Sequence, residues 1–202
     1  LMSVSTRLLR PRAENQIIVS NADYSVFEPS ERQSIEEVAV MDDRIVATIY
    51  DNVNGRAVAS EDKGEFGWPE TPLASPENVA IHLGSTSRSS GRIFYTYEGF
   101  LTPSTLSLAD VRTGKAEVIR RAPARFDASK DVVEQFEATS SDGVKIPYFV
   151  VRPKDAPLDG STPTVMFGYG GFEVSYAPAY KPELGKLWLE RGCAYAVANI
   201  RG

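Results

Sequence analysis

One segment of the chain has residue types that could stabilise a developing charge: the glycine-rich stretch GYGGF at residues 168–172. It directly follows the compact apolar run 164–167, as a loop leaving the end of a strand would. Glycines let a backbone approach a ligand closely, and fixed amides or a tyrosine hydroxyl can donate to a carbonyl oxygen that gains negative charge in acyl transfer. The stretch therefore predicts an oxyanion site that includes Tyr169. A glycine-rich turn without chemistry is the alternative.

Residues 133–202 must position this loop, and their pattern favours the first part of an α/β domain. Residues 133–139 and 144–152 are expected to form two strands joined by a Ser-Asp-Gly turn. Pro147 interrupts the second strand, which predicts a sheet edge or a bulge at that point.

A helix and a buried strand are expected after the loop. Residues 184–191 can form a helix with an apolar side that includes Leu184 and Leu187, and Gly192 is suited to be its C-cap. The continuous apolar run 194–200 is typical of a parallel strand covered on both faces. Strand, glycine-rich loop, helix and buried strand is the order of a βαβ unit. A sheet that ended at this last strand would expose an apolar edge, through which the chain is expected to self-associate.

Residues 1–132 have a different texture, with short strands and turns at intervals of about a dozen residues. This spacing favours a sandwich, a barrel or a propeller. The sequence RIVAT at 44–48 resembles RIFYT at 92–96, and an offset of 48 residues suits the blades of a propeller. Two similar strands without a repeat are the alternative. The expected strands are 16–20, 35–40, 44–50, 56–60, 78–83, 92–97, 104–108 and 115–120, with a turn at 52–55.

Three motifs, in order and with similar spacing, resemble the prolyl oligopeptidase family of serine peptidases. They are SDGVKIP at 141–147, GYGGF at 168–172 and AVANIRG at 196–202. One departure is Phe167, which stands where many members of the family have tyrosine.

The resemblance implies a mixed fold and a partial chain. Residues 1–132 would be the C-terminal blades of a β-propeller, and residues 133–202 the N-terminal part of an α/β-hydrolase peptidase domain, truncated before the nucleophile. In such hydrolases the catalytic serine lies in a GxSxG motif and is followed by the aspartate and the histidine. This sequence has no GxSxG, and its single histidine, His82, lies in a strand pattern. We therefore expect the parent protein to be a serine endopeptidase and this chain to be inactive alone.

The same resemblance implies roles for particular residues. Tyr169 falls on the family tyrosine whose hydroxyl donates to the oxyanion. Phe172 falls on a phenylalanine that lines the pocket for the proline side of the scissile bond, and a core aromatic is the alternative for it. Gly170 and Gly171 would shape the loop, and Arg201 would have a structural role. No metal ion or cofactor is implied.

Composition narrows the partners of the chain. Its 22 basic and 27 acidic residues give a net charge of −5, and no basic run suggests a nucleic-acid partner. No apolar stretch reaches the roughly 18 residues needed to span a membrane. The single cysteine, Cys193, excludes an internal disulfide and fits a reducing, cytoplasmic setting.

The function implied for the parent is cleavage of short peptides after proline. Two alternatives remain at this level. One is a related enzyme with the same architecture: an oligopeptidase with basic-residue or acylaminoacyl specificity, or an esterase. The other is a non-catalytic β-propeller module that binds proteins, which would give Tyr169 no role.

Overall fold

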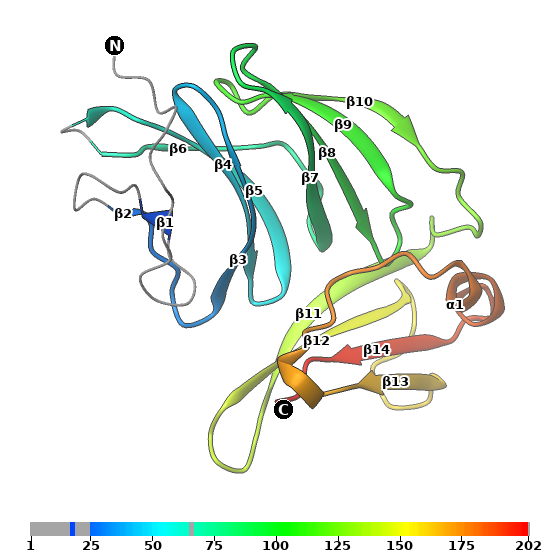
Figure 1. Ribbon diagram of the computed structural model, residues 1–202. Helices are drawn as coiled ribbons and strands as arrows, with labels where there is room; N and C mark the ends of the chain where they lie inside the picture. Colours follow the sequence, from blue (N-terminus) through cyan, green and yellow to red (C-terminus); the bar gives the residue numbers. More distant parts are fainter. Residues whose placement is uncertain (1–16, 19–24, 65–66, 202) are drawn as a thin grey trace. The chain divides into compact units, whose positions relative to one another are not determined.

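The computed structural model describes residues 17–18, 25–64 and 67–201 (Figure 1). Their contacts divide the chain into two compact units. The first unit comprises Leu1–Tyr97 and Thr105–Arg121, and the second comprises Glu98–Ser104 and Ala122–Gly202. The predicted domain boundary near residue 132 stays a prediction. Among the described residues, no helix has the length and apolarity needed to cross a bilayer.

The first unit contains two four-stranded antiparallel sheets in which strands that follow one another in the chain lie side by side. A short ladder of β1 (Ile17–Ile18) and β2 (Ser25–Phe27) precedes them. The first sheet consists of β3 (Gln33–Val40), β4 (Arg44–Asp51), β5 (Asn54–Glu61) and β6 (Glu70–Pro72), and the second of β7 (Val79–Ser87), β8 (Arg92–Gly99), β9 (Thr105–Asp110) and β10 (Ala116–Arg121).

The predicted repeat corresponds to equivalent strands of these two sheets. The runs 44–48 and 92–96 lie in β4 and β8, and each of these is the second strand of its sheet. The offset of 48 residues is therefore the spacing of two structural repeats, and the strands predicted from residue 35 to residue 120 are confirmed. The strand predicted at 16–20 lies partly outside the described residues. The short strand β6 had no signal in the sequence, because it is only three residues long.

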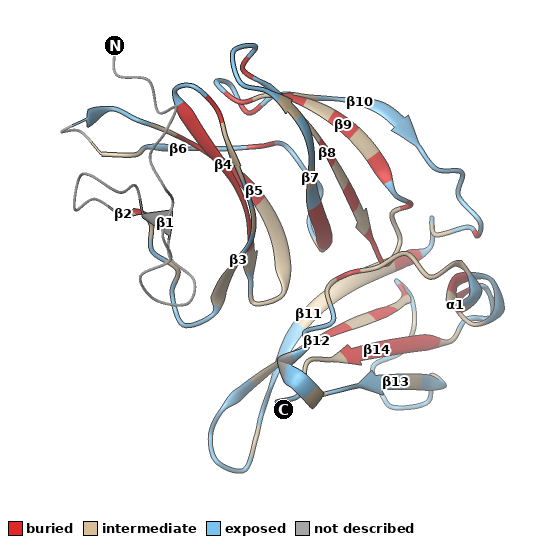
Figure 2. Ribbon diagram, in the orientation of Figure 1, coloured by how far each residue is buried: buried red, intermediate tan, exposed pale blue. Residues whose placement is uncertain are grey.

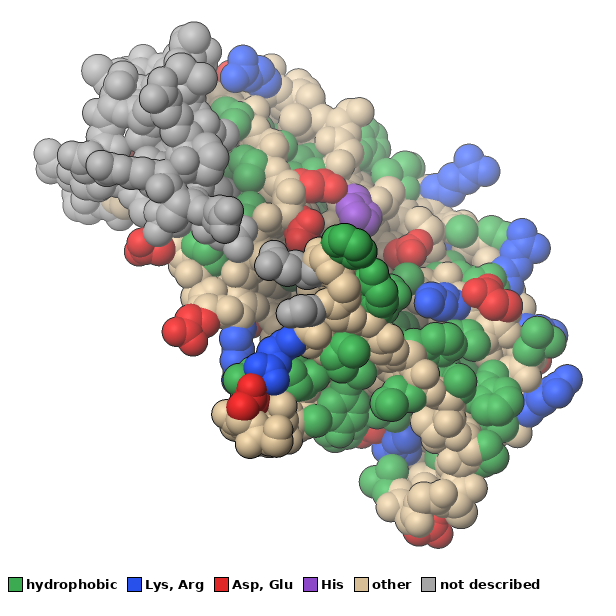
Figure 3. Space-filling model, turned by 60° about the horizontal axis from the view of Figure 1, so that its bottom comes forward, with side chains coloured by type: hydrophobic (Ala, Val, Ile, Leu, Met, Phe, Trp, Pro, Cys, Tyr) green, Lys and Arg blue, Asp and Glu red, His purple; other side chains and the backbone are tan. Residues whose placement is uncertain are grey.

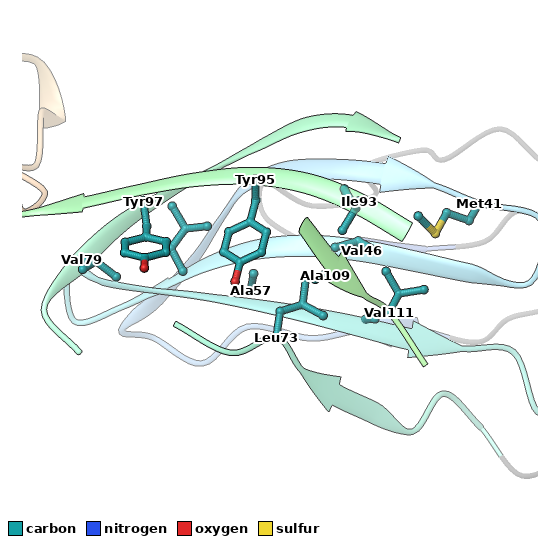
Figure 4. Packing of buried hydrophobic residues seen from close by; sticks show 12 residues of the cluster. Met41, Val46, Ala57, Leu73, Val79, Ile93, Tyr95, Tyr97, Ala109 and Val111 are labelled. Carbon is teal, nitrogen blue, oxygen red and sulfur yellow. The ribbon is translucent and has the colours of Figure 1, made fainter. Parts of the chain in front are cut away.

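Apolar side chains from both sheets form the main core of the first unit (Figure 4). Tyr95 and Tyr97 of β8 lie in this cluster with Val46 of β4 and Val79 of β7. Successive residues of a strand point to opposite faces, so Ile45 of β4 joins a second cluster on the other face of its sheet. As a result β4 is buried on both faces, as a strand between two neighbouring layers must be.

A tight turn between β4 and β5 carries unusual backbone angles. Asp51 pairs with Asn54, so the loop consists of Asn52 and Val53, and both have positive φ (51° and 69°). Positive φ at both loop residues is the signature of a type I′ turn, whose twist matches that of the flanking strands. The turn predicted at 52–55 is confirmed. Val53 is strained there, because β-branched residues rarely adopt this conformation.

The second unit contains one mixed sheet with the strand order β11-β12-β14-β13. β13 and β14 are parallel, whereas the other two pairs are antiparallel. The prediction of an edge at 194–200 was wrong, because β14 lies between β12 and β13 and is largely buried (Figure 2). Self-association through the open sheet stays a prediction, and the two edge strands of this sheet are β11 and β13. The strands are β11 (Asp131–Thr139), β12 (Lys145–Pro153), β13 (Thr164–Gly168) and β14 (Ala194–Ala198).

The prediction for Pro147 holds in part. Pro147 lies in β12, an inner strand, opposite Glu137 of β11 in a continuous register, so there is no bulge. The ladder between β12 and β14 ends at the pair Tyr148–Ala198. Beyond it the Pro147 carbonyl still accepts a hydrogen bond from the Asn199 amide, at 3.0 Å. Proline is tolerated there because the regular ladder, which would require its missing N–H, has already ended.

The predicted helix at 184–191 is two short helices, α1 (Pro182–Leu187) and the 3₁₀ helix η3 (Leu189–Arg191). Its buried side also differs from the prediction, because Leu187 is 59% exposed whereas Leu189 is 2% exposed. The buried residue of α1 is Gly185, whose lack of a side chain lets the helix lie directly on the ring of Phe126. The predicted C-cap is confirmed, since Gly192 has φ of 80° and ends η3.

Candidate active-site loop after strand β13

The glycine-rich stretch begins where a parallel strand ends. Gly168 is the last residue of β13 and pairs with Ala198 of β14, and the chain then turns through Tyr169 into the short 3₁₀ helix η2 (Gly171–Glu173). Sites in open α/β sheets lie outside the carboxyl ends of parallel strands. The loop therefore occupies the position in the second unit where such a site is expected.

The two glycines inside the loop make contacts that a side chain would prevent. A Cβ atom on Gly170 would overlap the carbonyl group of Arg201. A Cβ atom on Gly171 would lie 2.5 Å from the hydroxyl oxygen of Tyr169. The first contact is with backbone, which cannot yield easily, whereas the second is with the end of a side chain. The close contact of Gly170 with Arg201 thus fixes the position of the loop, and Gly171 leaves room for the side chain of Tyr169.

Both aromatic residues of the loop are turned toward the surface. Tyr169 is 40% exposed, and its ring centre lies 6.3 Å from that of Tyr176. Phe172 is 93% exposed, so it does not pack in a core of the described residues. Its backbone is left-handed, with φ of 57° and ψ of 28°. Such a conformation in a non-glycine residue is uncommon and is often found at functional sites.

A charged pair joins two of the three sequence motifs. The Arg201 guanidinium contacts Asp142 in the turn between β11 and β12, with Nη1 2.7 Å from Oδ2, and its Nη2 donates to Ser140 Oγ at 3.1 Å. The hydrogen bond from Arg201 is the main reason why the pKa of Asp142 lies below its ordinary value of 3.8. Because Arg201 also contacts Gly170 through its backbone, all three motifs meet at this residue. The expected structural role of Arg201 thus has partners, which sequence reasoning missed.

Asn199 holds the other end of the loop. Its Oδ1 accepts a hydrogen bond from the Tyr176 amide at 2.6 Å, and its Nδ2 donates to the Tyr176 carbonyl at 3.4 Å. An asparagine side chain that binds both backbone groups of one residue fixes the path of that segment. No feature of the sequence identified Asn199, because its partner lies 23 residues away.

His82 lies in the first unit and has a structural environment. Its Nδ1 is 3.0 Å from Glu37 Oε1, and the other oxygen of that carboxylate accepts a hydrogen bond from the Leu83 amide at 2.6 Å. The imidazole is exposed at the surface (Figure 3). These contacts link β7 to β3, as expected for a strand residue facing a neighbour.

Comparison with known proteins assigns the β-propeller fold of the first part of the chain and the family. The profile described as the prolyl oligopeptidase N-terminal β-propeller domain matches residues 7–122. An uncharacterized peptidase of Sinorhizobium fredii is 49% identical over 177 residues, which cover 88% of this chain and 24% of that protein. A prolyl endopeptidase of Elizabethkingia meningoseptica is 39% identical over 131 residues, which cover 61% of this chain and 18% of that enzyme. The structure of a post-proline cleaving enzyme from Rickettsia typhi superposes with a TM-score of 0.72 and 33% identity, covering 88% and 26%.

The two four-stranded sheets of the first unit lie within the match to a β-propeller domain, which confirms the prediction of propeller blades in that part of the chain. The chain belongs to the prolyl oligopeptidase family. It spans about a quarter of the length of the Sinorhizobium fredii peptidase and of other relatives that match 88% of it.

Proposed function

We propose that the chain is the segment of a serine peptidase in which the β-propeller passes into the catalytic domain, and that the whole enzyme cleaves short peptides after proline. In this proposal β11 to β14 begin an α/β-hydrolase domain. Support comes from the parallel pair β13–β14 with a glycine-rich loop at its carboxyl end. Relatives named prolyl endopeptidase, and a solved structure described as a post-proline cleaving enzyme, support the specificity.

The single observation that carries this function is the arrangement of GYGGF after β13. Tyr169 is accessible beside a bend of close-packed glycines, so its hydroxyl is available to donate to the oxyanion of a tetrahedral intermediate. Phe172 projects from the same bend and would offer an apolar wall to the flat proline ring of the substrate. Gly170 and Gly171 would give the loop the shape that both roles need.

The substitution Tyr169→Phe in the full-length enzyme tests the role of the hydroxyl. Loss of one oxyanion donor is expected to lower kcat by roughly 10- to 1000-fold on a proline-linked chromogenic peptide, with little change in KM. Tyr176→Phe is the matched control, because it removes a hydroxyl from the neighbouring ring and should leave kcat unchanged. An unchanged kcat for Tyr169→Phe would contradict the proposal.

The 202-residue chain is expected to be inactive by itself. A peptidase of this class needs a serine nucleophile activated by a histidine, and the sequence has no GxSxG motif and a single histidine in a structural position. Incubation of the purified chain with the same chromogenic peptide should therefore release no product. Turnover that a fluorophosphonate blocks would overturn this expectation.

A substrate panel separates the related specificities. Peptides that present proline, arginine or an acylated N-terminal residue before the scissile bond would be compared by kcat/KM on the full-length enzyme. The wall provided by Phe172 predicts preference for proline. The substitution Phe172→Ala should reduce kcat/KM for the proline peptide more than for the other two peptides.

A further inference from the structure

We propose that Asp142 and Arg201 form a positioning pair that sets the orientation of the oxyanion loop, although neither touches the substrate. The inference rests on the proposed function, since it assigns these residues to the same site. Asp142 lies in the turn between β11 and β12, and Arg201 follows β14. The pair therefore connects the far end of a hairpin to the segment on which the loop lies.

Arg201 contacts the turn of the hairpin through its side chain and the glycine-rich loop through its backbone. Its guanidinium is held by two contacts, at 2.7 Å to the Asp142 carboxylate and at 3.1 Å to Ser140. Its carbonyl group lies against Gly170, so closely that no side chain would fit. A displacement of the Arg201 backbone would thus be passed directly to Gly170 and to its neighbour Tyr169.

The loop is held at both ends by the same short segment. Gly170, near its start, lies on Arg201, and Tyr176, near its end, is held by its two hydrogen bonds with the Asn199 side chain. The Asn199 amide is in turn bonded to Pro147 of β12. Residues 199–201 therefore support the loop from below. The ion pair of Arg201 with Asp142 fixes the last residue of this supporting segment.

The pair is suited to tuning geometry rather than to holding the fold together. Both side chains are about half exposed, and exposed ion pairs contribute little to global stability. In contrast, a small misplacement of a catalytic group lowers the rate strongly. Loss of the pair should thus change turnover while the protein remains folded.

The test is a double-mutant cycle in the full-length enzyme with Asp142→Asn, Arg201→Gln and the double variant. Asn keeps the acceptor for the Val144 amide, 3.3 Å away, but removes the charge. Each single variant is expected to lower kcat by roughly tenfold, and the double variant by no more than either alone, with KM and the melting temperature nearly unchanged. Additive losses, or unchanged kcat in the single variants, would overturn the positioning role.

Two further variants complete the experiment. Asp159→Asn is the matched control, because Asp159 accepts a hydrogen bond from the Ser161 amide two residues on, as Asp142 does from Val144, but forms no ion pair within the part of the chain that the structure describes. It should leave kcat unchanged. Tyr169→Phe separates the two hypotheses. If it lowers kcat while Asp142→Asn does not, only the positioning pair is overturned. If Tyr169→Phe is without effect, the proposed function is overturned and the pair with it.

Discussion

The propeller blades and the loop after β13 use aromatic residues in opposite ways. Tyr95 of β8 is fully buried, and its ring lies 6.1 Å from that of Tyr97 inside the core between the two sheets. Phe172 in the loop is 93% exposed and Tyr169 is 40% exposed. Burial of a large side chain is favourable by about 1.5–3 kcal/mol, so a fold that leaves two rings exposed on one short loop forgoes that stabilisation. The blades use their rings for stability, whereas the proposed function assigns the exposed rings of the loop to the substrate.

Backbone strain shows the same contrast. The positive φ angles of Asn52 and Val53 are required by the geometry of a two-residue hairpin. The positive φ of Phe172 lies outside any hairpin, in a bend that is held at Gly170 by Arg201 and at Tyr176 by Asn199. Strain in the blades thus serves strand pairing, and strain in the loop orients an exposed ring. Four substitutions would test this division between stability and function.

The largest effect is expected for Gly170→Ala in the full-length enzyme. The new methyl group would overlap the Arg201 carbonyl and displace the loop, so kcat/KM should fall by roughly 100-fold. Gly168→Ala is the matched control, because its Cβ would meet Ala198 at an ordinary distance of 3.7 Å. Steady-state kinetics of both variants would check the prediction. Equal losses for the two glycines would contradict it.

The next effect concerns stability in the second unit. Gly185→Ala would drive a methyl group into the ring of Phe126, which is itself stacked on Tyr180 with ring centres 5.3 Å apart. Overpacking of this kind typically costs about 1–3 kcal/mol, which a lower midpoint of chemical denaturation would reveal. Leu187→Ala in the same helix removes an exposed side chain and should change stability by less than about 0.5 kcal/mol. A neutral result for Gly185→Ala would show that the ring can move aside.

A gain in stability is expected in the blades. Val53→Gly removes the strain of a β-branched residue with φ of 69° and creates the Asn-Gly loop that type I′ turns favour. The expected stabilisation is about 1 kcal/mol, with kcat unchanged. Denaturation and kinetics measured on the same preparation would check both parts. A change in kcat would show that the blades and the loop are not as separate as proposed.

The smallest effect is expected for Asp131→Asn and depends on pH. Asp131 is 8% exposed and lines a cavity of about 500 Å³. Burial, followed by the negative charges of Asp127 and Glu190, raises its pKa above the ordinary 3.8, although Lys154 opposes the shift. Below pH 3.8 the group is protonated whether folded or unfolded, so the substitution should have no electrostatic effect on stability. As the pH rises through the raised pKa, ionisation destabilises the folded state, and the Asn variant should become the more stable protein. Denaturation midpoints at pH 3.5 and pH 7 would check the sign.

The sequence predicted those features that depend on local pattern. The spacing of the short strands predicted an all-β unit, and the offset between β4 and β8 favoured a propeller without excluding a sandwich or a barrel. Gly192 marked the end of a helical segment correctly. The split of that helix at Trp188 was missed, and so was the contact of Gly185 with the ring of Phe126. A single sequence shows glycine and phenylalanine but not their contact.

The loop residues proposed for the site were named from the sequence, but their supports were not. GYGGF alone also suits a plain glycine-rich turn, and it became specific only through its resemblance, together with SDGVKIP and AVANIRG, to a family of peptidases. The roles of Asp142 and Asn199 were not visible, since each acts on a partner far away in the chain. Polar residues in turns are common, and only the folded structure shows which of them hold a loop.

The ion pair at Arg201 also has a consequence for the order of folding. Its hydrogen-bonded partner Ser140 is 61 positions earlier in the chain, so closing this contact requires a long intervening segment to be ordered. The hairpin of β11 and β12 and the blades depend on nearer neighbours and can form earlier during synthesis. The bend that would hold a reacting carbonyl is therefore expected to mature last, after the ribosome has released the residues on both sides of it. During synthesis the blades and the β11–β12 hairpin would therefore fold before the loop at 168–172 reaches its final position.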